Sequence, residues 1–284
     1  MTRDEKRTFS LEYFPPRSEK GEQSLAVARE ELSKLKPAFA SVTFGAGGST
    51  QDGTYQTVKS IIAEDGIDAA PHISCISTNR DTLSQMLSDY QELGVKRLVT
   101  LRGDIPSGYG MAEHNELRYA NELVEFIRQK SGDFFTLEVA AYPEFHPQAA
   151  SAKADLDNFK RKVEAGADSA ITQYFFNPDA YFRFIEDCQG MGLEIPIIPG
   201  IMPITNYKQL ARFSDACGAE IPRWIRKRLE SYGDDLESIR QFGLDVVTHL
   251  CEQLLEGGAP GLHFYSMNRS EPVRTIWNNL SLSG

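Results

Sequence analysis

The chain has 284 residues and a mass of 31.8 kDa, with 41% apolar and 25% charged residues, which is typical of a folded globular protein. Thirty basic and 40 acidic side chains give a net charge of −10. This charge argues against nucleic acid as the main partner, because phosphate binding needs a basic face. Small phosphorylated ligands in local basic pockets stay compatible with it.

Targeting and metal-binding patterns are missing from the sequence. No apolar segment follows residues 1–7 as in a signal peptide, and no run of about 18 apolar residues predicts a membrane span, so we expect a cytoplasmic protein without a membrane partner. The four cysteines form no C-x-x-C pair, and the five histidines show no metal-ligand spacing. We therefore expect no disulfide framework and no metal. A G-x-S-x-G serine hydrolase motif is also absent.

Short β-rich runs alternate with amphipathic stretches along the chain. Gly94, Gly132 and Gly166 follow three helical stretches, where a helix end favours glycine, and Asn177-Pro178 predicts another helix start. The predicted helices include 24–36, 81–93 and 115–130. The predicted strands are 9–14, 39–45, 69–75, 97–104, 135–142, 169–176, 194–201 and 261–267.

Eight strand–helix units predict parallel strands joined by helical crossovers, and eight such units in one domain predict a closed (β/α)8 TIM barrel. The long gap before the last strand predicts extra helices at 205–216, 220–231 and 234–256, after strand seven. We expect residues 1–284 to form this single α/β domain, without a regulatory domain. A doubly wound two-domain α/β fold is the alternative.

Alternation within the strands places polar side chains on one face. If the apolar set faces the helices, Glu12, His72 and Gln173 point into the barrel, and so do Arg102 and Asp104 at the end of their strand. Barrel active sites form at the carboxyl ends of strands, so these residues are site candidates. A structural polar network that fills the barrel interior is the other interpretation.

Two loops carry further signals. The glycine-rich run 45–48 before a helix suits an anion site, although a plain tight turn would give the same pattern. Asp155, Asn158 and Lys162 share one helix face in the segment 142–162, near a cluster of basic residues. A solvated helix surface explains this face equally well.

Eight segments, in chain order, resemble the bacterial 5,10-methylenetetrahydrofolate reductases from about residue 9 to residue 270. They are FSLEYFPPR, SVTFGAGGST, APHISC, LRGD, AAYPEFHPQA, ITQYFF, PGIMPITNYKQ and HFYSMNR. The resemblance implies a TIM barrel that binds FAD non-covalently across its C-terminal face. It also implies reduction of methylenetetrahydrofolate to 5-methyltetrahydrofolate, in one-carbon metabolism and methionine biosynthesis, with NADH or NADPH as the donor, and a homo-oligomer.

The family's site residues carry over as follows. Glu12 matches the general acid, and Asp104 matches an aspartate beside the flavin and the pterin. The substrate positions are Glu12, Asp104, Gln173, Tyr207, Tyr265 and Arg269, with Tyr207 at an aromatic stacking position where enteric relatives carry Phe. The FAD positions are Thr43, His72, Arg102, Gly103, Asp104, Tyr119, Ala120, Tyr142, His146, Ala149, Asp155, Asn158, Arg161 and Lys162.

The expected chemistry needs a proton and a hydride. The substrate's five-membered ring opens when its amine nitrogen receives a proton, and we expect Glu12 to hold that proton near neutral pH, because burial raises a carboxyl pKa. Reduced flavin then supplies hydride from N5, in a ping-pong sequence. A flavin-independent barrel lyase or folate-binding methyltransferase, and a non-catalytic binding barrel, are the alternatives. The sequence leaves the choice between NADH and NADPH open, and a partner subunit as electron donor also stays open.

Overall fold

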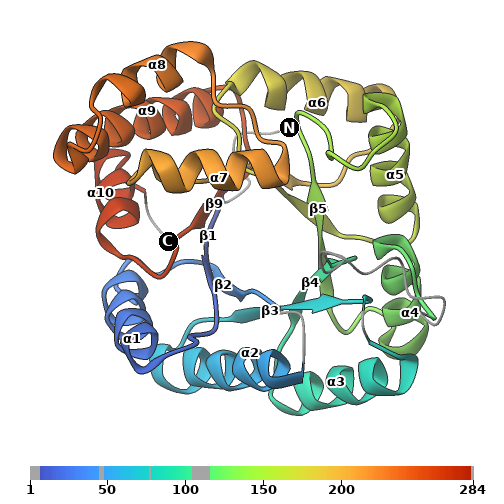
Figure 1. The fold of residues 1–284 in the computed structure, drawn as a ribbon. Helices are drawn as coiled ribbons and strands as arrows, with labels where there is room; N and C mark the ends of the chain where they lie inside the picture. The colour runs from blue at the N-terminus through green and yellow to red at the C-terminus, as the bar shows by residue number, and fades with distance from the viewer. Residues whose placement is uncertain (1–6, 45–47, 77, 104–115, 283–284) are drawn as a thin grey trace.

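The computed structural model describes residues 7–44, 48–76, 78–103 and 116–282, which form a ring of parallel strands surrounded by helices (Figure 1). The strands are β1 Thr8–Tyr13, β2 Phe39–Val42, β3 Ala69–Ser74, β4 Arg97–Leu101, β5 Thr136–Ala141, β6 Ser169–Thr172, β7 Ile197–Ile198, β8 Gly200–Ile201 and β9 Gly261–Tyr265. The helices are α1 Glu19–Ser33, α2 Gly48–Ser60 with a π-helical turn Ile61–Asp65, α3 Arg80–Glu92, α4 Ala120–Ser131, α5 Ala152–Glu164, α6 Pro178–Gly190, α7 Tyr207–Cys217, α8 Arg223–Ser231, α9 Leu236–Glu256 and α10 Glu271–Asn279.

All the strand pairings are parallel, in the order β7-β6-β5-β4-β3-β2-β1-β9-β8. The two ends of this ladder, β7 and β8, are separated in the chain only by Pro199. Proline lacks the backbone N–H that a continuous strand would need, so the predicted strand 194–201 is split in two. The ladder thus returns to its starting point and forms the predicted TIM barrel.

The predicted elements match the observed ones closely, and the differences follow a pattern. Predicted strands end several residues too late at β2, β4 and β6. Apolar residues continue beyond β2 and β6, at Phe44 and at 174–176, whereas Arg102 and Gly103 follow β4. The predicted helix 115–130 begins at Ala120. The helix predicted from Ser24 begins at Glu19, where the N-cap Ser18 hydroxyl accepts a hydrogen bond from the Gly21 N–H. The insertion after the seventh strand is confirmed as α7, α8 and α9.

Helix boundaries follow the predicted signals. Gly94, Gly132 and Gly166 all adopt positive φ within two residues of the ends of α3, α4 and α5, where glycine is favoured. The Asn177 side chain accepts a hydrogen bond from the Asp179 N–H, with Pro178 as the first residue of α6. None of the helices in the described ranges is long and apolar enough to cross a membrane.

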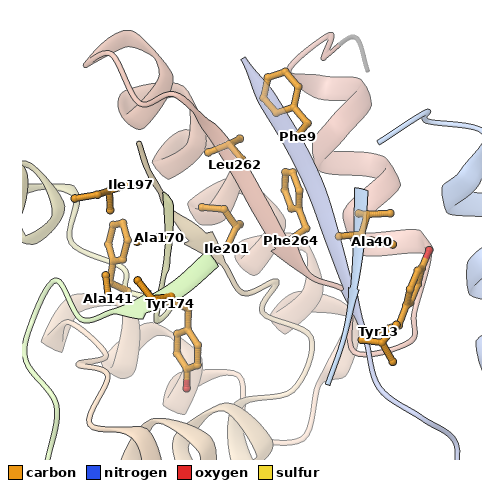
Figure 2. Packing of buried hydrophobic residues seen from close by; sticks show 14 of the residues in the cluster. Phe9, Tyr13, Ala40, Ala141, Ala170, Tyr174, Ile197, Ile201, Leu262 and Phe264 are labelled. Carbon is orange, nitrogen blue, oxygen red and sulfur yellow. The ribbon is translucent and has the colours of Figure 1, made fainter. Parts of the chain in front are cut away.

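Alternation along the strands sorts the side chains into two layers. Phe9, Leu11 and Tyr13 of β1 belong to the main apolar core between strands and helices, as do Leu262 and Phe264 of β9 (Figure 2). Ser10 and Glu12 therefore point into the barrel, as predicted. On β5, Leu137 and Val139 join the same core, which turns Glu138 inward.

Strand β4 contradicts the prediction that the apolar set faces the helices. Val99 and Leu101 form a small interior cluster with Phe39, Ala70 and Ile171, whereas Leu98 packs in the outer core. Thr100 alternates with Val99 and Leu101, so it faces outward, and Arg102 lies beyond the strand end. Because β4 is apolar on both faces, alternation alone could not determine its orientation.

Candidate active site

The carboxylate of Glu12 is surrounded by polar side chains from neighbouring strands. Its Oε2 lies 3.3 Å from His72 Nε2 on β3, 3.5 Å from the Ser41 hydroxyl on β2 and 3.8 Å from His263 Nε2 on β9. The Glu12 side chain is 19% exposed, whereas that of His263 is fully buried. Glu12 thus lies inside the barrel but still reaches solvent at the mouth.

The sequence predicted a raised pKa for Glu12, but the structure lowers it. Burial does raise the pKa, but hydrogen bonds and charge interactions with His263 and His72 outweigh it and lower the pKa to about 2. The carboxylate is therefore the stable form at neutral pH in the described structure. The prediction neglected the two histidines, whose stabilisation of the charged form exceeds the burial effect.

The loop after β9 holds the end of β1 in place. The Ser266 hydroxyl donates to the Glu12 carbonyl at 2.5 Å, and the Asn268 amide both accepts from the Phe14 N–H and donates to the Phe14 carbonyl. Met267 and Asn268 have φ angles of 53° and 52°, in the left-handed region. Such strain persists where surrounding contacts enforce it, and it is common at functional sites. Sequence analysis missed this clamp.

Tyr265 crosses the barrel interior next to Glu12. Its hydroxyl donates to the Thr172 carbonyl at 2.7 Å, and its ring lies against Gly200, where an added Cβ would meet the Tyr265 ring at 2.7 Å. Burial and the charge of Glu12 raise the pKa of Tyr265 well above its ordinary value, so its hydroxyl stays protonated. The predicted substrate residue Tyr265 is thus brought next to the predicted acid.

A second group of predicted residues gathers beyond β5. The rings of Tyr142 and His146 meet edge to face at 4.6 Å, and the His146 N–H donates to Asp155 at 2.9 Å. Lys162 donates from Nζ to the Ala140 carbonyl at 2.5 Å. Burial lowers the pKa of Lys162 to about 8, against the opposing charge of Asp155. These contacts turn Asp155 and Lys162 toward the barrel, whereas Asn158, which was predicted on the same helix face, is exposed.

Arg102 joins this second group through a hydrogen bond to Gln148 at 2.5 Å, in the loop after β5. The neighbouring Gly103 has a φ of 89°, and an added Cβ would lie 2.1 Å from the Ser74 hydroxyl. Glycine is therefore required at this strand end by both backbone conformation and space. Asp104 lies outside the described residues, as does the glycine-rich run up to residue 47.

The remaining predicted cofactor residues are placed as follows. Asn158 accepts from Arg161 at 3.0 Å on the exposed side of α5, and the Ala149 N–H donates to the His146 carbonyl. Tyr119 caps α4, which begins at Ala120, and is half exposed. Thr43 follows β2 and binds the Tyr13 carbonyl through its N–H.

Helix α7, which crosses in front of β9 in Figure 1, presents two aromatic candidates. Tyr207, which is partly buried against the core, donates its hydroxyl to Glu230 of α8 at 3.3 Å. Phe213 is one turn before Cys217, which lines a small pocket together with Tyr142 and Gln173. Tyr207 stays a predicted stacking residue, and Phe213 is a second aromatic residue of α7 that the sequence analysis did not single out.

Gln173 and Arg269 lie at the mouth as well. The Gln173 N–H continues the β5–β6 ladder by donating to the Ala141 carbonyl, and its side-chain oxygen accepts from the Tyr174 N–H. Arg269, which is exposed, lies 3.5 Å from the Thr205 hydroxyl in the loop before α7. The structure thus collects Glu12, Tyr265 and Gln173 at the same end of the barrel.

Comparison of the sequence with known protein families identifies the family of this chain. A family model described as methylenetetrahydrofolate reductase matches residues 1–281. The chain belongs to the methylenetetrahydrofolate reductase family. It is 41% identical to the 5,10-methylenetetrahydrofolate reductase of Escherichia coli (strain K12) over 273 residues, which cover 96% of this chain and 90% of that protein. The family's oxidoreductase activity, the reduction of methylenetetrahydrofolate, is therefore the activity of this chain.

Other similar proteins agree in fold. A methylenetetrahydrofolate reductase (NADH) of Zea mays is 35% identical over 98% of this chain, which spans 49% of the plant protein. A solved structure of an uncharacterized protein from Clostridium thermocellum, described as binding two copies of 5-methyl-5,6,7,8-tetrahydrofolic acid, matches with a TM-score of 0.64 at 19% identity, covering 96% of this chain and 93% of that one. This last likeness supports the barrel fold that the strand order shows.

Proposed function

We propose that this chain reduces 5,10-methylenetetrahydrofolate to 5-methyltetrahydrofolate with FAD as its bound cofactor, NADH or NADPH as the electron donor and Glu12 as the general acid. The observation that supports it best is the placement of Glu12, a carboxyl group inside the barrel with one oxygen held by three polar groups and its side chain still partly exposed at the mouth. The folate-binding neighbour of the same fold and the plant relative named for NADH favour the same substrate and donor.

The residues beyond β4 and β5 fit a flavin dinucleotide. A pyrophosphate needs cations and N–H donors, and Lys162, Arg161 and Arg102 provide charges on or beside the α5 face. Gly103, which leaves no room for a Cβ, lets a ligand approach the backbone closely. We propose that Lys162 and Arg102 hold the phosphates and that Tyr142 and His146 contact the organic part of FAD.

When bound, FAD would carry hydride from the nicotinamide donor to the folate carbon in two separate half-reactions. The protein residues then have three tasks. Tyr265, Gln173 and an aromatic residue of α7 orient the pterin at the mouth. Glu12 transfers a proton to the substrate's amine nitrogen, which opens the five-membered ring and leaves an electrophilic iminium. A folate bound at the mouth would exclude water from Glu12, and this added burial would raise its low pKa, because burial favours the neutral carboxyl group.

The pKa of about 2 sets a condition on this proposal. At neutral pH only a small fraction of free enzyme carries the proton on Glu12, so the proton must be taken up as substrate binds. The electron pair of the protonated C–N bond leaves with the nitrogen, and the carboxylate that remains is stabilised by the groups around Oε2. A low pKa therefore speeds proton donation but makes the folate half-reaction fall as pH rises.

The purified protein tests the proposal directly. It should be yellow with the absorption bands of oxidised flavin, lose that colour on addition of NADH or NADPH without oxygen, and regain it on addition of methylenetetrahydrofolate. Initial rates with NADH and NADPH side by side would identify the donor. A colourless protein that takes up no FAD, or a flavin that folate fails to reoxidise, would contradict the proposal.

A further inference from the structure

One fully buried histidine, His263, remains without a role in the function proposed above. It lies on β9 in the barrel interior, and its ring stacks on Phe39 with centroids 6.0 Å apart. Its two nitrogens face different groups. Nδ1 lies 2.8 Å from the Ser10 hydroxyl on β1, and Nε2 lies 3.5 Å from the Ser41 hydroxyl and 3.8 Å from Glu12 Oε2.

The contacts define a direction for the hydrogen bonds. The Ser41 hydroxyl donates to Glu12 Oε2, so its oxygen is available to accept from His263. An N–H at His263 Nε2 donates to the Ser41 hydroxyl and lies 3.8 Å from Glu12 Oε2, and in the neutral ring Nδ1 then accepts a hydrogen bond from the Ser10 hydroxyl. The resulting chain runs from Ser10 to His263 to Ser41 and ends on one carboxylate oxygen of Glu12.

The second carboxylate oxygen of Glu12, Oε1, differs from Oε2 in its contacts. In the described part of the chain, the contacts of the Glu12 side chain all reach Oε2, including that of His72 Nε2 at 3.3 Å. The backbone of Glu12 is fixed separately through Ser266. Oε1 is thus the oxygen left to exchange a proton with a ligand at the mouth.

We propose that His263 is a positioning residue, which uses Ser10 to fix its tautomer and Ser41 to reach Glu12, so that Oε2 is held inside the barrel and Oε1 is left for the substrate. This inference rests on the function proposed above, because it assigns His263 through the acid role of Glu12. Nothing covalent changes at His263, which donates a hydrogen bond to Ser41 and through it stabilises the carboxylate that remains after proton transfer.

The surroundings of His263 contain few other charges. Glu12 and His72 face it from β1 and β3, and Tyr265 lies on its own strand with ring centroids 5.4 Å apart. Arg97 of β4 lies over the Phe39 ring and pairs with the buried Glu138 of β5. The sequences of β6, β7 and β8 contain no ionisable side chain. A change at His263 should therefore act mainly on Glu12.

The test is the pH dependence of the two half-reactions in His263→Leu. Removing the donor should raise the pKa of Glu12, so we expect the folate half-reaction to reach its half-maximal rate at a pH about one unit or more higher than in the unchanged enzyme. Its limiting rate should fall, because the remaining carboxylate is less stabilised. Reduction of the flavin by the nicotinamide donor should be unaffected.

Two variants serve as controls. His263→Gln keeps an N–H donor and should restore a profile close to that of the unchanged enzyme, and Ser10→Ala, which leaves the ring in place, should shift the profile in the same direction by less. Thr100→Val changes a buried barrel threonine that faces the helices and should leave the profile in place.

The outcomes separate the two proposals. If the His263 variants lower the folate half-reaction equally at every pH, or if His263→Gln behaves like His263→Leu, the positioning role is overturned. Should His263→Leu fail to fold, the Ser10→Ala profile decides in the same way. If the unchanged enzyme binds no flavin or its flavin is not reoxidised by folate, the proposed function itself fails, whatever the variants do.

Discussion

The titration of Lys162 offers a quantitative test of the cofactor site. Burial lowers the pKa of Lys162 to about 8 from an ordinary value of 10.5. If its ammonium group holds a phosphate of FAD, only the protonated form contributes, and the association constant follows the protonated fraction. That fraction falls from about nine-tenths at pH 7 to about one-tenth at pH 9, so FAD affinity should weaken about tenfold, or about 1.4 kcal/mol.

The assay is titration of the apoprotein with FAD by calorimetry or flavin fluorescence between pH 6.5 and 9.5. Lys162→Arg keeps its charge over this range, so the FAD affinity of this variant should stay nearly constant. Any pH dependence that remains in Lys162→Arg comes from other titrating groups and can be subtracted. Lys162→Met should bind weakly at every pH. A flat profile in the unchanged protein, or the same slope in Lys162→Arg, would refute the assignment of Lys162 to the phosphates.

The same pKa shift predicts a stability change with a defined sign. Because the pKa of Lys162 is lower in the folded than in the unfolded chain, its protonation opposes folding below pH 8, and this opposition disappears as pH rises from 8 to 10.5. Lys162→Met should therefore unfold at a higher denaturant concentration than the unchanged apoprotein at pH 7, and the difference should shrink by pH 10.5. An equal difference at both pH values would show that the effect comes from packing.

Three further predictions follow from single contacts. Glu12→Gln should slow flavin reoxidation by folate about 10²–10⁴-fold and leave flavin reduction by NADH or NADPH intact, and loss of both steps would make Glu12 structural. Gly103→Ala should lower the unfolding free energy by about 1–2 kcal/mol or more in urea denaturation, partly recovered by adding Ser74→Ala, whereas an unchanged midpoint would contradict the close approach. Tyr207→Ala should raise KM for folate more than Phe213→Ala does, because Tyr207 stands at the predicted stacking position, and equal effects of the two variants would contradict that assignment.

How far the sequence predicts this barrel depends on the pattern within each strand. In β1, polar and apolar residues alternate strictly, so Glu12 points inward once Phe9, Leu11 and Tyr13 are assigned to the side of the helices. In β4, Leu98, Val99 and Leu101 are all apolar, and only the structure shows that Val99 and Leu101 face inward. Order and spacing of the elements were predictable because crossover helices recur at nearly constant distance along the chain.

The electrostatics of the site could not be predicted in the same way, because they arise from pairing across strands. Glu12 and His263 meet only because β9 pairs with β1, which joins segments near the two ends of the chain. A single-residue argument considers burial alone and predicts a raised pKa for Glu12. The register places Ser10 beside His263, and the imidazole beside the carboxylate reverses the sign of the shift.

The contacts between the loop after β9 and the end of β1 show why a sequence motif can be recognised while its structural role stays unpredicted. Residues 261–267 were predicted as a strand, yet the strand ends at Tyr265, and Met267 and Asn268 adopt left-handed φ angles without a glycine to indicate them. Asn268 tolerates this conformation, and its side-chain amide binds both backbone groups of Phe14. The strain is thus maintained by contacts with a segment far away in sequence, and its effect is to fix the backbone at Glu12, the residue on which the proposed chemistry depends.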